Sequence, residues 1–343
     1  MSVQVQFNKN DKFENIKVVE VPKPTLNADD EVLVKFILNP VNGSDIESIL
    51  GINGLAPVSY PATPGLEGVA RVESIGKNVD RVKVGQRVVV LPDTEINYVA
   101  AEGTWSTYRV YKQSVLFPVP DNISDEAAAQ AINNPITVYG LLDKLNAPKG
   151  EYIVQTAAAS SLGRILIQFA KARGLKTINL VRRKEQIEEL KSVGADEVFS
   201  TEDGTDIVEE IKKITDGKGA YGVIDAVGGE LGLKLSQVVR DDGTIILYSF
   251  LGGEQVNVSG ADLLLRHVNY TGFFVTKHFA DAGIEKYDEA VTKVFELFAN
   301  EVKPLPGKRF PLEKVTDAIH QSLNPNKEKK YSWFTPNSFN LIF

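Results

Sequence analysis

One stretch of the chain, from Tyr152 to Val181, constrains the possible fold more than any other. It begins with an apolar run at residues 152–154, continues through a turn of small residues, and ends in a second apolar run at 178–181. Between the turn and the second run, residues 164–173 have the spacing of an amphipathic helix. The stretch therefore predicts a strand, a turn, a helix and a second strand, which form one unit of a parallel α/β sheet.

The turn consists of very small residues between Thr156 and Gly163. Small side chains let a diphosphate approach the backbone, and the N–H groups at the start of the following helix attract an anion. The glycine fingerprint G-x-G-x-x-G of dinucleotide-binding turns is only partly met, because its positions fall on Ala158, Ser160 and Gly163. The turn alone is therefore a weak match to a dinucleotide site.

A basic triplet, Arg182, Arg183 and Lys184, follows the second strand. NAD-binding units place an Asp or Glu roughly 20 residues after the fingerprint, against the ribose 2′-hydroxyl. A carboxylate there would repel a 2′-phosphate, whereas a guanidinium can hold it with two parallel charge-assisted hydrogen bonds. The triplet therefore predicts NADPH rather than NADH as the cofactor. The alternative interpretation is that these residues are the solvated start of an ordinary exposed helix.

Length and composition limit the classes of protein that this chain can belong to. Its 343 residues exceed the size at which one hydrophobic core usually stops growing, so two domains are expected. A net charge of -7 argues against nucleic acid as a partner. No apolar run approaches the roughly 18 residues of a membrane helix, so no membrane partner is expected.

The residues at the start of the chain resemble no targeting segment. A secretory signal would have an apolar core, and a transit peptide would be Arg-rich and acid-poor, but Asp11, Glu14 and Glu20 precede the first arginine, Arg71. A cytoplasmic protein is therefore expected, although a chain trimmed of its presequence would look the same.

The chain contains no cysteine and only three histidines, His267, His278 and His320, which are widely spaced. Disulfides and thiolate metal sites are therefore excluded, and no metal-ligand pattern is present. A zinc-dependent dehydrogenase is disfavoured by composition alone.

Two kinds of periodicity divide the chain. Alternating apolar runs at 3–7, 16–21, 31–38, 69–76 and 87–90, with Pro and Gly between them, predict a β-rich, partly closed antiparallel barrel. From Ser124, which can cap a helix, strands alternate with helices as in a doubly wound parallel sheet. From about residue 302 the alternation stops, so the last stretch is assigned back to the first domain. The expected domains are 1–123 with 302–343, and 124–301.

Residues 65–76, Gly-Leu-Glu-Gly-Val-Ala-Arg-Val-Glu-Ser-Ile-Gly, and residues 84–88 look like a catalytic-domain signature. The chain thereby resembles the medium-chain dehydrogenase/reductase superfamily, in its zinc-free quinone reductase and 2-enoyl thioester reductase branches. Zinc-binding members carry a ligand histidine directly before the glutamate, where this chain has Leu66. The resemblance implies a Rossmann domain inserted in a GroES-like catalytic domain, a metal-free site, and a homodimer formed through the strand near 270–274.

Three segments, at 103–105, 134–139 and 155–183, look most like the enoyl thioester reductases. The resemblance assigns two sets of residues to the cofactor. The first set would touch the cofactor through Asn134, Ser160, Ser161, Leu162 and Gly163, and its 2′-phosphate through Arg182, Arg183 and Lys184. The set around the nicotinamide is Tyr248, Ser249, Phe250, Leu251, Phe273, Phe274 and Val275, with Lys330 reaching the cofactor from the tail.

Asn42 and Asn53 are the candidate catalytic residues. Enoyl reductases carry a tyrosine in the loop after a Ser-Asp-Ile motif; here the motif is present at 44–46, but the tyrosine position holds Asn53. An amide can donate a hydrogen bond to a developing enolate, but it cannot serve as a proton donor at neutral pH. By likeness to the quinone reductases, Asn42 would orient substrate or nicotinamide, although its surroundings also favour a plain turn. Asp45 and Glu67 are either acid–base residues or ion-pair and capping residues.

These observations predict an NADPH-dependent, metal-free reductase that transfers hydride to an activated double bond of a quinone or an α,β-unsaturated carbonyl compound. Reduction of trans-2-enoyl thioesters of CoA or an acyl carrier is the alternative within enzymes, although an acidic chain without an evident basic face favours small free substrates. A third class is an NADPH-binding sensor or interaction protein with little turnover. The missing tyrosine and the incomplete glycine fingerprint support that third class.

Overall fold

The structure is a computed structural model that describes residues 1–9, 12–51, 56–91, 102–324 and 331–335. The chain forms two units. Unit 1 contains Met1–Asn133 and Phe279–Phe343, and unit 2 contains Asn134–His278. Within the described ranges, no helix is both long enough and apolar enough to cross a membrane.

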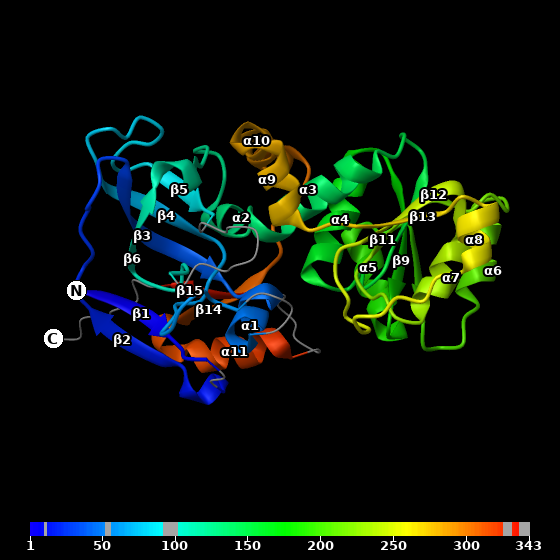
Figure 1. Ribbon diagram of the computed structural model, residues 1–343, viewed down its shortest axis with the longest axis horizontal. Helices are drawn as coiled ribbons and strands as arrows, with labels where there is room; N and C mark the ends of the chain where they lie inside the picture. The colour runs from blue at the N-terminus through cyan, green and yellow to red at the C-terminus, as the bar shows by residue number, and fades with distance from the viewer. Residues whose placement is uncertain (10–11, 52–55, 92–101, 325–330, 336–343) are drawn as a thin grey trace. The chain divides into compact units, whose positions relative to one another are not determined.

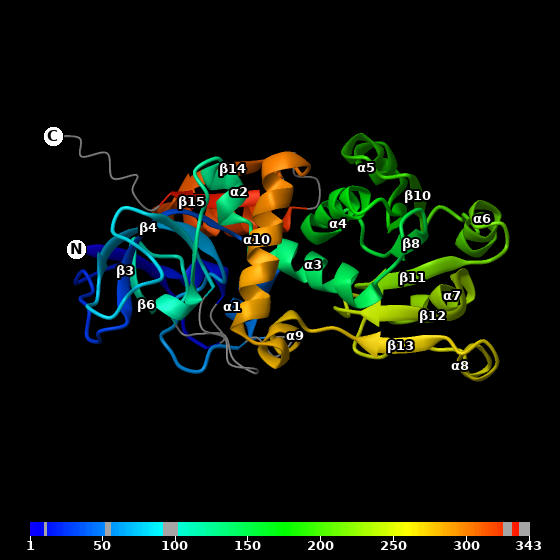
Figure 2. The same cartoon turned by 90° about the horizontal axis from the view of Figure 1, so that it is seen from above.

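Unit 2 is built on a six-stranded parallel sheet. The strands are β8 (Tyr152–Gln155), β9 (Lys176–Val181), β10 (Glu197–Ser200), β11 (Ala220–Asp225), β12 (Val239–Leu247) and β13 (Asn269–Gly272). Their order in the sheet is β10-β9-β8-β11-β12-β13, and Figure 2 shows β11, β12 and β13 next to one another, with β13 at the edge. This is the 3-2-1-4-5-6 order of a Rossmann fold, which confirms the predicted doubly wound sheet.

Helices cover both faces of this sheet (Figure 1). They are α3 (Asn133–Leu145), α4 (Ser161–Ala172), α5 (Ile187–Val193), α6 (Ile207–Ile214), α7 (Leu231–Val238) and α8 (Gly260–Leu265). Helix α9 (Val275–Ala282) follows β13 in the chain and contains the boundary between the two units. Apolar side chains of α6 and α7 pack with Ile178 and Leu180, whereas those of α4 and α5 pack with Val181. Because successive strand residues point to opposite faces, the two sets of helices bury both sides of the strands.

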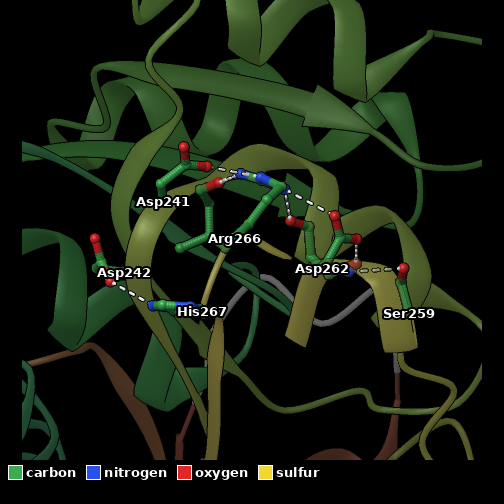
Figure 3. A network of polar contacts seen from close by, with 8 residues as sticks. Asp241, Asp242, Ser259, Asp262, Arg266 and His267 are labelled. Carbon is green, nitrogen blue, oxygen red and sulfur yellow. Dashed lines mark hydrogen bonds and ion pairs between the residues drawn. The ribbon is translucent and has the colours of Figure 1, made fainter. Parts of the chain in front are cut away.

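One side chain, Arg266, ties together the amino ends of β12 and β13 (Figure 3). Its guanidinium donates to Ser236 O at 2.7 Å and Val239 O at 2.5 Å, where α7 ends and β12 begins. It also contacts Asp241 at 2.8 Å and Asp262 at 3.1 Å. Ligands bind at the opposite, carboxyl ends of the strands in open α/β sheets. The network therefore stabilises unit 2 at a distance from any ligand.

Arg266→Ala is expected to lower the free energy of unfolding of unit 2 by about 2–4 kcal/mol, because it removes several charge-assisted hydrogen bonds at once. Arg266→Lys keeps the charge but loses the planar fork, so most of that loss should persist. Urea unfolding followed by circular dichroism measures the change. Lys234→Ala, which removes an exposed cation from α7, is the matched control and should change little. A similar small change for Arg266→Ala would contradict the stabilising role.

Unit 1 is β-rich, as the sequence predicts. Its main sheet has the order β14-β15-β3-β4-β5-β7, with β6 also paired to β3, and β1 pairs with β2 separately. The strands are β1 (Ser2–Gln6), β2 (Lys17–Val21), β3 (Glu31–Pro40), β4 (Gly68–Ile75), β5 (Arg87–Val90), β6 (Tyr108–Lys112), β7 (Leu116–Pro118), β14 (Gly307–Pro311) and β15 (Tyr331–Thr335). Phe334 of β15 pairs with Asn39 of β3, so β15 lies in the same sheet as β3, β4 and β5.

The units divide after Asn133 and after His278, whereas the sequence places the boundaries after residues 123 and 301. The helices of unit 1 are α1 (Gly43–Leu50), α2 (Asp125–Ala129), α10 (Ile284–Asn300) and α11 (Val315–Leu323). Helix α2 contacts β3 and β4. The Tyr287 ring of α10 stacks on Phe117 at 5.7 Å between centroids, and Asp288 pairs with Arg81. An amphipathic helix has the same pattern whichever sheet it covers, so the sequence could not place α2 and α10.

Candidate cofactor-binding and catalytic residues

The turn between β8 and α4 is held in one shape by its own hydrogen bonds. Ala158 N donates to Leu180 O of β9 at 3.1 Å, and Ser160 N donates to Ala157 O at 2.9 Å. Ser160 caps α4, since its Oγ accepts from Gly163 N at 3.0 Å. Ala157 has a φ of 49°, in the left-handed region that costs an alanine roughly 1–2 kcal/mol. The amino end of α4 is thereby fixed at the carboxyl end of β8.

Gly163 lets the helix approach the turn closely. A Cβ atom at this position would lie 2.5 Å from Ala158 O and 2.7 Å from Ala158 Cα. Close packing of helix on strand is the role of the third glycine in the dinucleotide fingerprint. The packing of this turn therefore requires a glycine at the third fingerprint position, and Gly163 occupies it.

Two buried polar side chains that the sequence analysis missed support the turn from inside unit 2. Gln155 Nε2 donates to Gly163 O at 3.0 Å. Arg164 Nε donates to Ala159 O at 3.2 Å, and its guanidinium pairs with Glu189 at 2.7 Å. A polar residue within an otherwise apolar strand is the signal that could have identified Gln155.

The basic triplet lies beside this turn. Strands β8 and β9 are parallel neighbours with Gln155 opposite Asn179, so their carboxyl ends meet at one edge of the sheet. Arg182 and Lys184 are exposed and Arg183 is half-buried. The Arg182 Nε atom is 3.9 Å from Glu202 Oε1. The structure therefore brings the predicted turn and the predicted cationic residues to the same edge.

Asp225, at the carboxyl end of β11, organises the loops at this edge. Its buried carboxylate accepts from Thr156 Oγ1 at 2.7 Å, Val227 N at 2.8 Å, Gly228 N at 3.1 Å and the Tyr270 hydroxyl at 3.3 Å. The aspartate thus links the ends of β8, β11 and β13. It holds the shape of the loops in which the remaining candidates lie.

The candidates after β12 and β13 lie at the same edge but differ in exposure. Tyr248 N donates to Asp225 O at 2.9 Å, and Phe273 N donates to Leu247 O at 2.8 Å. Exposed and half-buried side chains in this group are Ser249, Phe250, Leu251, Phe274 and Val275. Phe273 instead is buried, with its ring 5.0 Å from the His278 ring. Asn134 lies in the first turn of α3, whereas Asn53 and Lys330 lie outside the described residues.

In unit 1, Asn42 belongs to a buried polar cluster with Asp45 and Glu67. Asn42 Nδ2 donates to Glu67 Oε1 at 2.8 Å, and Asn42 N donates to Asp45 Oδ2 at 2.7 Å. The other oxygen of Asp45 accepts from Leu66 N at 2.9 Å. Asp45 therefore caps α1 while it also holds the backbone beside Glu67.

Glu67 caps a second helix. Its Oε2 atom accepts from Ile132 N and Asn133 N, both at 2.9 Å, at the start of α3. The amino end of a helix carries orphan N–H groups and partial positive charge, which a carboxylate satisfies. Of the two interpretations of Asp45 and Glu67, the contacts favour capping.

Burial sets the protonation of this pair. Removal from water raises the pKa of Asp45 to about 8, and the neighbouring Glu67 adds to the shift. Burial also raises the pKa of Glu67 to about 7, although hydrogen bonds from Asn133, Asn42 and Ile132 oppose it. Each of these carboxyl groups binds its proton more tightly in the folded protein than in the unfolded chain.

The stabilising effect of protonated Glu67 should be complete below pH 4.5 and should disappear as the pH rises through about 7. The free energy of unfolding of the wild type, minus that of Glu67→Gln, is therefore expected to fall across this range by up to about 1.4 kcal/mol per pH unit. Urea titrations at intervals of pH measure the difference. A difference that stayed constant with pH would show that Glu67 has an ordinary pKa.

Comparison with known proteins shows similarity over almost the whole chain. Residues 28–121 match the family model "Alcohol dehydrogenase GroES-like domain", and residues 161–296 match "Zinc-binding dehydrogenase". The mitochondrial enoyl-[acyl-carrier-protein] reductase of Caenorhabditis elegans is 31% identical over 312 residues, which cover 88% of this chain and 86% of that protein.

Two solved structures are also similar in sequence and fold. The quinone oxidoreductase of Pseudomonas syringae has a TM-score of 0.83 and 25% identity, and covers 98% of this chain and 100% of that one. The Escherichia coli quinone oxidoreductase, solved in complex with NADPH, has a TM-score of 0.80 and 25% identity, and covers 97% and 100% of the two chains.

The described residues of unit 1 do not fit the zinc ion that one family description mentions. Directly before Glu67 stands the apolar Leu66, and the chain has no cysteine. Both carboxyl oxygens of Asp45 and of Glu67 accept hydrogen bonds from amide N–H groups. Among the described residues, no three His, Asp or Glu side chains are arranged to hold a metal ion.

Proposed function

Because the chain belongs to the medium-chain dehydrogenase/reductase superfamily, in the branch of the quinone and enoyl reductases, we propose that it binds NADPH and reduces an activated double bond. The proposed substrates are small quinones and α,β-unsaturated carbonyl compounds. The observation that supports this most is the position of Arg182–Lys184 beside the small-residue turn, at the carboxyl ends of two neighbouring parallel strands.

The residues of unit 2 fit this cofactor. Backbone N–H groups at the start of α4 would hold the diphosphate, close to Gly163. Arg182, Arg183 and Lys184 would hold the 2′-phosphate, because guanidinium groups bind phosphate bidentately. Asn134 and the residues after β12 and β13 would contact the nicotinamide half. Bound NADPH supplies the hydride that is added to the β-carbon of the substrate.

Charge then develops on the substrate oxygen, and the protein must stabilise it. A preorganised donor is worth far more in a site that excludes water than in solution. Asn42 is the proposed donor in unit 1, together with Asn53. Since an amide does not release its proton at neutral pH, the proton is proposed to come from solvent or from the cofactor ribose.

Reduction of 2-enoyl thioesters is the second candidate. It is favoured by the 31% identity to an enoyl-[acyl-carrier-protein] reductase over most of both chains. Against it stands Asn53 at the position where the enoyl reductases resembled by this chain carry a tyrosine. The balance between the two candidates therefore depends on the substrate pocket rather than on the cofactor site.

Steady-state oxidation of NADPH tests the proposal against a panel of quinones, enals and trans-2-enoyl thioesters. Turnover of quinones or enals in preference to thioesters is the expected result, and NADH should support much slower turnover at equal concentration. Preference for thioesters would establish the second candidate instead. Tight NADPH binding without turnover of any acceptor would indicate a sensor or interaction protein.

A further inference from the structure

Glu67 joins three parts of unit 1 that are far apart in the sequence. One carboxylate oxygen accepts from Asn42 Nδ2 at 2.8 Å, and the other accepts from Ile132 N and Asn133 N at 2.9 Å. Its backbone carbonyl accepts from Thr104 Oγ1 at 2.7 Å. The side chain is only 1% exposed. Glu67 therefore links the Asn42 amide to the segment that leads into α3, and it does so without access to solvent.

In the hydrogen bond between Asn42 and Glu67, the Asn42 amide is the donor, and this matters for the proposed chemistry. A carboxamide has a donating nitrogen end and an accepting oxygen end, whereas an ionised carboxylate only accepts. In the structure the nitrogen end of the Asn42 amide faces Glu67, so its oxygen end points away from Glu67. This hydrogen bond is buried, and a hydrogen bond is stronger in the protein interior than in water. Glu67 thus selects one of the two orientations of the Asn42 amide.

Asp45 contacts backbone rather than side-chain groups in the same cluster. Its oxygens accept from the backbone amides of Asn42 and Leu66, and so they fix the main chain. The orientation of the Asn42 side chain is fixed by Glu67 at its nitrogen end and by the capping box, in which the side chain accepts from the backbone of Asp45, at its oxygen end. The two carboxyl groups therefore separate the placement of the Asn42 backbone from the orientation of its amide.

We propose that Glu67 is a positioning residue for the reaction, which acts through Asn42: one N–H of the Asn42 amide donates to Glu67, and the other N–H of the same NH2 group is thereby directed at the substrate oxygen. The role rests on the proposed reductase function. Glutamine in place of Glu67 keeps the size but has one accepting oxygen. That oxygen can serve either Asn42 or the start of α3, and the NH2 group then faces a donor on the other side.

The kinetic test compares Glu67→Gln, Asn42→Ala and the double variant, with the best acceptor found in the panel. Glu67→Gln is expected to lower kcat roughly 30-fold with the KM for NADPH changed less than about twofold, because one oriented hydrogen bond is lost. The double variant should lose no more kcat than Asn42→Ala alone, since the proposal assigns the effect of Glu67 on turnover to Asn42, whereas its hydrogen bonds to the start of α3 act on stability. Ser48→Ala, which removes a buried hydroxyl from α1, is the control and should keep the wild-type kcat.

A kcat for Glu67→Gln within about twofold of wild type would overturn the proposal, and so would losses that multiply in the double variant. If Glu67→Gln does not fold, Glu67→Asp takes its place, because the shorter carboxylate keeps the charge but does not reach both partners. The same loss of kcat is then expected.

A second measurement keeps this proposal separate from the reductase function. In protein labelled with 15N-asparagine, the side-chain NH2 signals of Asn42 are those absent from the spectrum of Asn42→Ala. They are expected to shift in Glu67→Gln and to stay in place in Ser48→Ala. Absence of turnover in the wild type would refute the reductase function alone. Unmoved Asn42 signals in Glu67→Gln would refute the positioning role, whether or not the protein turns over.

Discussion

Replacement of both Arg182 and Arg183 with alanine is expected to weaken NADPH binding about a hundredfold or more and to leave NADH binding within about twofold. Each charge-assisted hydrogen bond to a phosphate contributes about 1.5–3 kcal/mol, and every 1.4 kcal/mol is tenfold in affinity. NADH lacks the 2′-phosphate, so the arginines have no such group to hold. Isothermal titration calorimetry with both cofactors measures the two dissociation constants.

The control for this experiment is Lys191→Ala, which removes an exposed cation from the neighbouring helix α5. It should change neither affinity, because a general loss of positive charge acts only weakly through solvent at physiological salt. Equal losses for NADPH and NADH in the arginine variant would show that these side chains serve the fold or another part of the cofactor. The preference for NADPH would then need another source.

Gly163→Ala is expected to weaken binding of NADPH and NADH alike, by about a hundredfold or more. The new methyl group would lie 2.5 Å from Ala158 O, a backbone atom that cannot turn aside. The turn or the start of α4 must therefore move, and the N–H groups that would hold the diphosphate lose their alignment. Calorimetry with each cofactor measures the loss, and the melting temperature reports how much of it reflects destabilisation.

Gly260→Ala is the matched control, because Gly260 begins α8 and a Cβ atom there would meet nothing within 4 Å. This variant should keep wild-type affinity for both cofactors and at least wild-type stability. A Gly163→Ala protein that bound NADPH as tightly as the control would show that the diphosphate lies elsewhere. Titration with both cofactors also separates Gly163→Ala, which should bind both more weakly, from the arginine variant, which should lose affinity for NADPH alone.

The sequence predicts the fold well where a pattern is local. The alternation at 31–38 and the run at 87–90 reappear as β3 and β5, and the strand–helix alternation becomes the doubly wound sheet. A local sequence pattern does not predict an element whose formation depends on tertiary packing. Helix α3 begins with Asn133 and carries Pro135 and Gly140, so its sequence gives little sign of a helix. Its start is instead held by Glu67, which is 65 residues away from Ile132 in the chain.

The candidate site likewise has parts that the sequence predicts and parts that it does not. The turn and the basic triplet are predictable, because both follow strands within one βαβ unit and parallel strands end at one edge. The contact between Asn42 and Glu67 is not predictable, since it joins a helix cap to a residue 25 positions later that is buried beside it. A single carboxylate in a sequence looks the same whether it caps a helix, pairs with a cation or orients an amide.

The arrangement of the chain in unit 1 also bears on how the protein is made. Strand β3 pairs with β15, and all of unit 2 comes between them in the sequence. During synthesis on the ribosome, the pairing of β3 with β15 cannot form until β15 has been made, whereas unit 2 uses one continuous segment and can fold as soon as it has emerged. We expect unit 2 to become protease-resistant first, and unit 1 only after β15 has emerged from the ribosome.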